Sequence, residues 1–201
     1  MITDISAPNY KFSDFITEFD NALDEDFCNH CIEKFKTDDR RYPGLVGAGL
    51  NEEIKKSTDL SISKITGWEK EDKIFCNKVS EYFKKYCEIH KFMDIHEYCE
   101  GWGDAGYQIQ ETVPGGFYTW HHDFAHGHED SNWNPRYFTF IWYLNDIHED
   151  GYTEFIDGTK IQPETGKMII FPSTWTYTHR GYPPKSEVKY ICTGWIHGVL
   201  K

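Results

Sequence analysis

The second half of the chain alternates short runs of β-branched and aromatic residues with turn-forming segments, and this pattern constrains the fold most strongly. Segments such as Pro-Gly-Gly, Asn-Trp-Asn-Pro and Pro-Glu-Thr-Gly separate the runs, and their residue types favour turns over strand interiors. Six or more short strands at this spacing predict a sandwich or a barrel. The runs span residues 107–112, 117–124, 136–146, 153–156, 167–171 and 188–196.

Two helices are expected ahead of these strands. A helix over 12–36 is predicted because an acidic stretch precedes an apolar run, as helix starts prefer. A helix over 69–92 is predicted because its apolar residues recur at spacings of three and four. Residues 37–58 read as a loop, and a short strand is expected near 60–65. The first helix rests on Phe27, Ile32 and Phe35, and the second on Ile74, Phe75, Val79, Tyr82, Phe83 and Tyr86.

The length and composition fit one mainly β domain of the α+β class. The chain has 201 residues, of which 17% are aromatic, and disordered chains are poor in aromatic residues. No compositional shift marks a domain boundary. We therefore expect a single domain over 1–201, with helical support over about 12–92 and a β core over about 105–198.

Charge and hydropathy argue against several classes of partner. The 21 basic and 33 acidic residues give a net charge of −12, which disfavours the basic footprint of a duplex nucleic-acid binder. No run approaches the roughly 20 apolar residues that a membrane span needs, and the first residues do not resemble a secretory signal. We expect an intracellular, cytoplasmic protein without a membrane partner.

The six cysteines are expected to be reduced thiols in that compartment. Cys28 and Cys31 form a Cys-x-x-Cys pair, but no second pair follows at zinc-finger distance. Their spacing also fits one face of a helix, where small thiols pack well, and we favour this packing over a zinc or redox role.

The segment 118–123, Tyr-Thr-Trp-His-His-Asp, carries the strongest chemical signal. Residues i and i+2 of a strand share a face, so His121 and Asp123 project together and His122 faces away. One imidazole and one carboxylate are two corners of the facial triad that binds non-haem Fe(II), and His179 is the natural third corner. A single His-x-Asp pattern also arises by chance.

Lys189 supports the metal interpretation. Strand alternation over 188–195 places Lys189, Ile191, Thr193 and Trp195 on one face. A lysine that points into an apolar β interior needs an anionic partner, because an isolated buried ammonium is costly. A dicarboxylate cosubstrate would supply that partner. The alternative is a lysine at a strand edge that extends to water.

With these residues in place, the sequence resembles the prolyl 4-hydroxylase-like branch of the Fe(II)/2-oxoglutarate dioxygenases over roughly residues 105–197. The resemblance extends weakly to the segment 55–59, Lys-Lys-Ser-Thr-Asp. It implies a double-stranded β-helix (jelly-roll) core with the metal between its sheets. The matching motifs are His121-x-Asp123, His179, Lys189 followed by Trp195, Tyr118, Arg136-x-x-Thr139, Tyr143-Leu-Asn145 and Gly151-x-Thr-Glu-Phe155.

The resemblance assigns roles to individual residues. His121, Asp123 and His179 become the iron ligands and hence the catalytic residues. Lys189 becomes the partner of the distal carboxylate of 2-oxoglutarate. The cosubstrate pocket would also include Thr139, Trp195 and, by position, Tyr118, although simple alternation puts Tyr118 on the opposite strand face from His121. The implied cofactors are Fe(II), with 2-oxoglutarate and O2 as cosubstrates and ascorbate as a reductant.

One departure concerns the cosubstrate pocket. Thr112 stands where relatives often carry a cosubstrate-binding tyrosine. Gln108 and Gln110 share its face by alternation, so an amide could substitute. Two segments, 43–51 and 126–135, are candidates for a lid over the barrel mouth. Arg180 is expected either to pair locally or to meet an acidic substrate.

The leading functional hypothesis is an oxygenase that hydroxylates a peptidyl residue, such as proline, with 2-oxoglutarate as cosubstrate. A second hypothesis changes the substrate to a free amino acid, another small metabolite or a nucleobase. A third is a non-catalytic jelly-roll that binds a metal or ligand, and a fourth is a zinc hydrolase with the same triad. The zinc hydrolase leaves Lys189 without a role.

Overall fold

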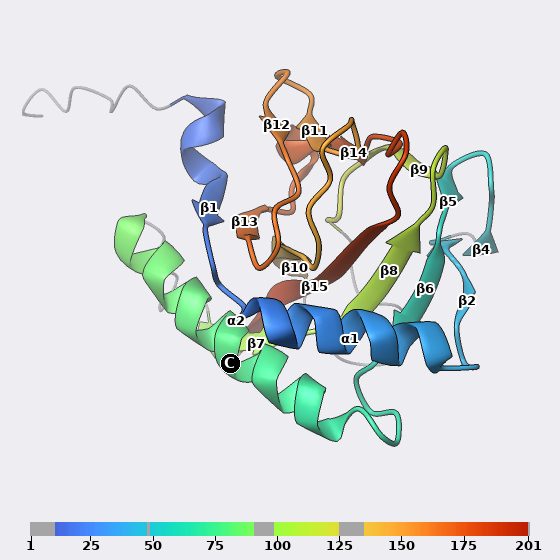
Figure 1. Ribbon diagram of the computed structural model, residues 1–201. Coiled ribbons are helices and arrows are strands. Elements are labelled where there is room, and N and C mark those ends of the chain that lie inside the picture. Colours follow the sequence, from blue (N-terminus) through green and yellow to red (C-terminus); the bar gives the residue numbers. More distant parts are fainter. Residues whose placement is uncertain (1–10, 48, 91–98, 125–134, 201) are drawn as a thin grey trace, which may run out of the picture.

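The computed structural model describes residues 11–47, 49–90, 99–124 and 135–200. Two helices precede most of the strands (Figure 1). The elements are η1 (Phe12–Phe15), β1 (Thr17–Phe19), α1 (Glu25–Thr37), β2 (Tyr42–Pro43), β3 (Leu45–Val46), β4 (Gly49–Leu50), β5 (Lys55–Lys56), β6 (Thr58–Ser61), α2 (Glu69–Ile89), β7 (Cys99–Asp104), β8 (Gln108–Thr112), β9 (Phe117–His121), β10 (Arg136–Tyr143), β11 (Thr153–Phe155), β12 (Lys160–Ile161), β13 (Met168–Pro172), η2 (Trp175–Tyr177), β14 (His179–Gly181) and β15 (Lys189–Leu200).

Two antiparallel sheets and a small hairpin make up the β structure. The larger sheet runs β1-β13-β10-β15-β8-β6-β2, with β7 also paired to β15. The smaller sheet runs β12-β11-β14-β9-β5, and β3 pairs with β4 in the hairpin. This arrangement confirms the mainly β class with two helices and the jelly-roll core that the sequence implied.

Strand alternation divides the larger sheet into two different faces. On β10, Phe138, Phe140 and Trp142 belong to the main core that α1 and α2 share. The intervening Ile141 and Tyr143 belong to a second core with residues of the smaller sheet, such as Phe155. Both helices lie against the outer face of the larger sheet (Figure 1), so its inner face meets the smaller sheet. Within the described ranges, neither helix has both the length and the apolar character that crossing a membrane requires.

The predicted elements compare with these as follows. The helix over 69–92 is confirmed as α2, and each of the six predicted β runs contains a strand. The helix over 12–36 is confirmed only from Glu25, where α1 begins, and is wrong before it, because Thr17–Phe19 pairs with the edge of β13 instead. Hydrogen bonding to a sheet edge outweighs the local helical signal there.

The expected loop over 37–58 contains four short strands. Lys55–Lys56 pairs with β9, and Tyr42–Pro43 pairs with β6, the strand expected near 60–65. Strand β7 was not predicted, because Gly101 and Gly103 interrupt any alternating pattern. Both sheets therefore draw strands from the region before residue 92 as well as from the later β region.

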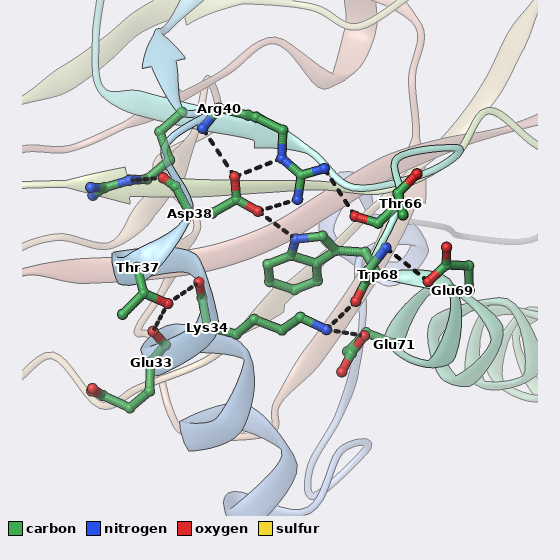
Figure 2. A network of polar contacts seen from close by, with 11 residues as sticks. Glu33, Lys34, Thr37, Asp38, Arg40, Thr66, Trp68, Glu69 and Glu71 are labelled. Atoms are coloured by element: carbon green, nitrogen blue, oxygen red, sulfur yellow. Dashed lines mark hydrogen bonds and ion pairs between the residues drawn. The ribbon is translucent and has the colours of Figure 1, made fainter.

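A polar network joins the end of α1 to the start of α2 (Figure 2). The carboxylate of Asp38 accepts hydrogen bonds from the Arg40 side chain and from Nε1 of Trp68, the latter at 2.8 Å. Trp68 is fully buried, and Lys34 of α1 reaches Glu71 of α2 at 2.7 Å. The side-chain hydrogen bond from Arg40 is the largest of the effects that lower the pKa of Asp38.

We expect Asp38→Ala to lower the free energy of unfolding by about 1–3 kcal/mol at pH 7, because it leaves the buried Trp68 N–H without an acceptor. The pKa of an aspartate in the unfolded chain is about 4. Because the pKa of Asp38 is lower in the folded state, the carboxylate stabilises the fold fully above about pH 4. The difference between wild type and variant should therefore shrink as the pH falls below about 4. Urea denaturation at several pH values measures this difference in the free energy of unfolding. The matched control is Asp39→Ala, because Asp39 is the exposed neighbour and its loss should change the free energy of unfolding little.

Candidate active site

A cavity of about 520 Å³ opens between the two sheets. The larger sheet contributes Thr139, Lys189 and Trp195, and the smaller sheet contributes His121 and His179. Asp123 follows the end of β9 and lines the same cavity. The structure thus brings together the residues that the sequence analysis placed in one site, although Tyr118 and Trp195 lie 77 positions apart in the chain.

His121, Asp123 and His179 form the one group of metal-type ligands found among the described residues, with ligand atoms within 4.8 Å of one another. Nε2 of His121 lies 3.8 Å from Oδ1 of Asp123, and Nε2 of His179 lies 3.6 Å from Oδ2. The pairing of β14 with β9 sets His179 directly opposite His121. Two imidazoles and one carboxylate are the donor set of a facial-triad iron site.

The protonation states of the three side chains also suit a metal. Nδ1 of His121 lies 2.7 Å from the carbonyl of Thr119, and Nδ1 of His179 lies 3.0 Å from the carbonyl of Tyr177. A carbonyl only accepts, so each Nδ1 carries the proton and each Nε2 keeps its lone pair. Burial and the neighbouring His179 lower the pKa of His121 to about 4.

Asp123 is held as an anion. Burial alone would raise the pKa of Asp123, but the two imidazoles and a hydrogen bond from Thr139 outweigh it and lower the pKa. The Thr139 hydroxyl donates to Oδ2 of Asp123 at 2.8 Å and lies 2.9 Å from the Ser173 hydroxyl. The hydroxyl of Thr139 therefore orients a metal-type ligand, and its predicted contact with the cosubstrate stays a prediction. Sequence spacing gave no sign of the bond to Asp123.

Tyr118 corrects the simple alternation of β9. Its ring stacks on the His121 ring with centroids 3.5 Å apart, and both side chains line the cavity. The expectation that Tyr118 faces away from His121 is wrong, because the β9–β14 pairing shifts register between His179 and Gly181. The Lys55 ammonium lies over the Tyr118 ring, 5.2 Å from its centroid.

Lys189 lines the cavity from the start of β15 and is 4% exposed. Its ammonium donates to the carbonyl of Gly151 at 2.8 Å, and burial lowers the pKa of Lys189 to about 8. No carboxylate within the described ranges forms an ion pair with it. Gly151 has φ +66°, and a β-carbon there would lie 2.7 Å from Ile147, so glycine is needed at this turn. The alternative of a strand-edge lysine that reaches water is excluded by this burial.

The floor of the cavity beside Lys189 is polar. Thr112 is the register partner of Lys189, and Gln110 and Gln108 follow on the same face, as alternation predicted. The Gln110 amide nitrogen donates to the side-chain oxygen of Gln108, and the Gln108 amide nitrogen donates to the Tyr42 hydroxyl at 3.0 Å. Amides therefore occupy the inner face of β8.

Two charged groups in the cavity were not assigned a role from the sequence. The guanidinium of Arg136 lies 3.5 Å from the centroid of the Trp195 ring, a close cation–π contact. Lys55 pairs with the fully buried Asp59 at 2.6 Å. The sequence motif that contains Arg136 gave this residue no role. Lys55 and Asp59 lay in the weakest part of the resemblance, so the burial of this ion pair could not be inferred.

The remaining expectations concern the rim. Of the candidate lid 126–135, all but Pro135 lies outside the described residues. Segment 43–51 contains the β3–β4 hairpin, of which Leu45, Val46 and Gly47 line the cavity. His122 is exposed at the rim. Arg180 pairs locally with Glu154 at 2.6 Å on the outer face of the smaller sheet.

The cysteine pair lies away from this cavity. Cys28 and Cys31 are fully buried in α1 within the main core. Burial is the main cause that raises the pKa of both thiols, that of Cys28 to about 12. Both therefore pack as small apolar side chains, as their helical spacing suggested.

Comparison with known proteins fits this geometry. Residues 107–197 match the family described as the 2OG-Fe(II) oxygenase superfamily. Comparison with curated protein sequences gives no significant match. The matched region contains all three residues of the His-Asp-His group, so over this region the chain is similar to that superfamily in both sequence and site. The matched family implies Fe(II) and 2-oxoglutarate as cofactor and cosubstrate.

Solved structures share the fold over nearly the whole chain. A viral collagen prolyl hydroxylase from Paramecium Bursaria Chlorella virus-1, in complex with 2OG, gives a TM-score of 0.64 at 20% identity and covers 92% of this chain and 97% of its own. A Pseudomonas putida prolyl-4-hydroxylase gives 0.64 at 16% identity, with coverage of 91% and 92%. A Trichoplax adhaerens prolyl hydroxylase, in complex with a hypoxia inducible factor peptide fragment, gives 0.72 at 16% identity, with coverage of 92% and 84%.

We predict that Thr139→Val weakens Fe(II) binding by about 10- to 100-fold, because loss of a hydrogen bond to a ligating carboxylate has effects of this size. Anaerobic titration of the apo-protein measures the affinity. His122→Ala is the control, because this exposed side chain adjoins two of the ligand-type residues and should change affinity little, whereas His179→Ala should abolish tight binding. Wild-type affinity in Thr139→Val would contradict the role given to the hydroxyl.

Proposed function

We propose that the protein hydroxylates a C–H bond of a peptidyl residue, such as proline, and couples this reaction to oxidative decarboxylation of 2-oxoglutarate. The observation that carries the proposal is the buried ammonium of Lys189 in the same cavity as the His-Asp-His group. A metal site alone needs no such cation. A cosubstrate that chelates the metal at one end and carries a carboxylate at the other accounts for both features.

In this proposal His121, Asp123 and His179 hold Fe(II) through two Nε2 atoms and a carboxylate oxygen. Bound iron, with 2-oxoglutarate and O2, supplies the oxidising power that protein side chains lack. The Lys189 ammonium binds the distal carboxylate of 2-oxoglutarate, and the Gly151 carbonyl orients that ammonium. Thr112 is the register partner of Lys189, and in this proposal its hydroxyl donates to the same carboxylate. Ascorbate is proposed as a reductant.

The outer part of the cavity suits a peptide. Arg136 has guanidinium donors beside the stacked Trp195 ring, and such donors bind a backbone carbonyl. The β3–β4 hairpin adds an apolar edge, since Leu45 is 51% exposed beside the cavity. One of the similar structures contains a bound peptide fragment, and two others are named as prolyl hydroxylases. These features together support a peptidyl substrate.

Two other hypotheses remain to be separated by experiment. A free amino acid or another small metabolite would use the same metal and cosubstrate residues and leave the hairpin edge without a role. A non-catalytic module would bind the metal and produce no succinate. The net charge of −12 argues against a nucleobase within a nucleic acid.

The test measures succinate formed from 2-oxoglutarate by the iron-loaded protein, first without substrate and then with panels of peptides and free amino acids. We expect slow uncoupled turnover alone and a clear stimulation by proline-containing peptides, with a mass increase of one oxygen in the peptide. Stimulation by free amino acids alone would overturn the peptidyl assignment. No succinate under any condition, despite bound iron, would favour the non-catalytic module.

We predict that the affinity for 2-oxoglutarate depends on the protonation of Lys189. Its pKa of about 8 in the free protein means that the ammonium form is present below pH 8 and is lost above it. The dissociation constant should be nearly constant below pH 8 and rise by about tenfold per pH unit above it, since binding must then take up a proton. Anaerobic calorimetry with the Mn(II)-loaded protein measures both the affinity and the proton uptake.

Two substitutions of Lys189 serve as controls. Lys189→Arg keeps its charge over this pH range and should lose the pH slope. Lys189→Ala should weaken 2-oxoglutarate binding far more than metal binding. Equal loss of both affinities in Lys189→Ala would show that the lysine supports the fold of the site and does not bind the carboxylate.

A further inference from the structure

We propose that Phe12, in the short η1 turn near the start of the chain, is a positioning residue for the imidazole of His179. The inference rests on the proposed role of His179 as a metal ligand. Phe12 lies 167 positions before His179 and does not line the cavity. Its effect is transmitted through Tyr177, whose carbonyl fixes the tautomer of His179.

The contacts form a continuous path. The Phe12 ring stacks on the Tyr177 ring with centroids 4.3 Å apart and an angle of 23° between the planes. The Tyr177 hydroxyl donates to the carbonyl of Phe12 at 3.2 Å, so the two residues are joined at both ring and backbone. The Tyr177 carbonyl then lies 3.0 Å from Nδ1 of His179. Phe12 also meets Phe155 edge-on at 6.2 Å, and Phe155 lies against the His179 ring at 5.7 Å.

The two histidines of the site differ in how their carbonyl partners are held. Thr119, the partner of His121, lies inside β9 between two paired strands, and its N–H donates to Ile54 at 2.8 Å. Tyr177, the partner of His179, belongs to η2, a turn of only three residues. Trp175 in that turn is 72% exposed, whereas Tyr177 is 8% exposed. We infer that the position of the Tyr177 carbonyl depends on the packing of the Tyr177 side chain, on which the Phe12 ring is stacked.

The first test reads the tautomer of His179 in the metal-free protein. Nitrogen-15 NMR of histidine-labelled protein distinguishes protonated Nδ1 from protonated Nε2, and His179→Gln identifies the signal. We expect the Nδ1–H form in wild type and a mixture of tautomers in Phe12→Ala. The signal of His121, whose partner is held by the sheet, should not change. Phe12→Tyr keeps the ring and should restore the wild-type tautomer.

The second test measures Zn(II) affinity, because zinc is redox-inert and needs no turnover. We expect Phe12→Ala to weaken binding by about tenfold, the lower end of the range for residues that orient a ligand. Tyr177→Phe, which removes only the hydroxyl bond to Phe12, should act in the same direction with a smaller size and is the milder variant if Phe12→Ala folds poorly.

The matched control is Phe19→Ala in β1. It makes the same change in the same N-terminal segment, but Phe19 packs on Tyr82 in the other core, with centroids 5.1 Å apart. Wild-type tautomer and zinc affinity in Phe12→Ala, or equal losses in both variants, would overturn the proposal. Failure of wild type to bind zinc would contradict the proposed metal site, and the tautomer comparison would still decide whether Phe12 positions His179.

Discussion

The antiparallel pairing of β14 with β9 is the constraint on which the site depends. It sets His179 opposite His121 and brings two residues that are 58 positions apart to a ring separation of 4.3 Å. Asp123 then completes the group from beyond the end of β9, and Thr139 of the larger sheet fixes its carboxylate. The site therefore spans both sheets. Any change that shifts one sheet relative to the other would move Thr139 and Lys189 away from the three ligand-type residues at the smaller sheet.

The alternation of β15 explains how a polar cavity can exist inside a stable domain. Tyr190, Cys192 and Ile196 point to the core that the two helices cover, while Lys189 and Thr193 point to the cavity. Apolar burial on the outer face offsets the cost of polar groups on the inner face. Lys55 and Asp59 reduce that cost further by pairing with each other, whereas Lys189 donates to the Gly151 carbonyl and has no carboxylate partner among the described residues. Because the helices cover only one face of the larger sheet, its other face is free to line the cavity.

Several features were predictable from short-range patterns. The spacing of Phe75, Val79 and Phe83 identified α2, and alternation placed Lys189 and Trp195 on one inner face. The local pattern failed where a distant partner decided the outcome. Thr17–Phe19 is a strand because β13 has a free edge beside it, and Tyr118 stacks on His121 because the β9–β14 register shifts. The roles of Arg136 and Phe12 also depend on partners far along the chain.

The sequence by itself determined the class of the fold and the residue types of the site, because strand alternation and the His-x-Asp spacing are local properties of the chain. The tertiary structure alone decided which nitrogen of each histidine faces the site, how Asp123 is held as an anion, and how far Lys189 is buried. These properties arise from carbonyls, hydroxyls and strand neighbours that only the folded chain brings within hydrogen-bonding distance. A ligand set can therefore be predicted from spacing, but its protonation and orientation are consequences of packing.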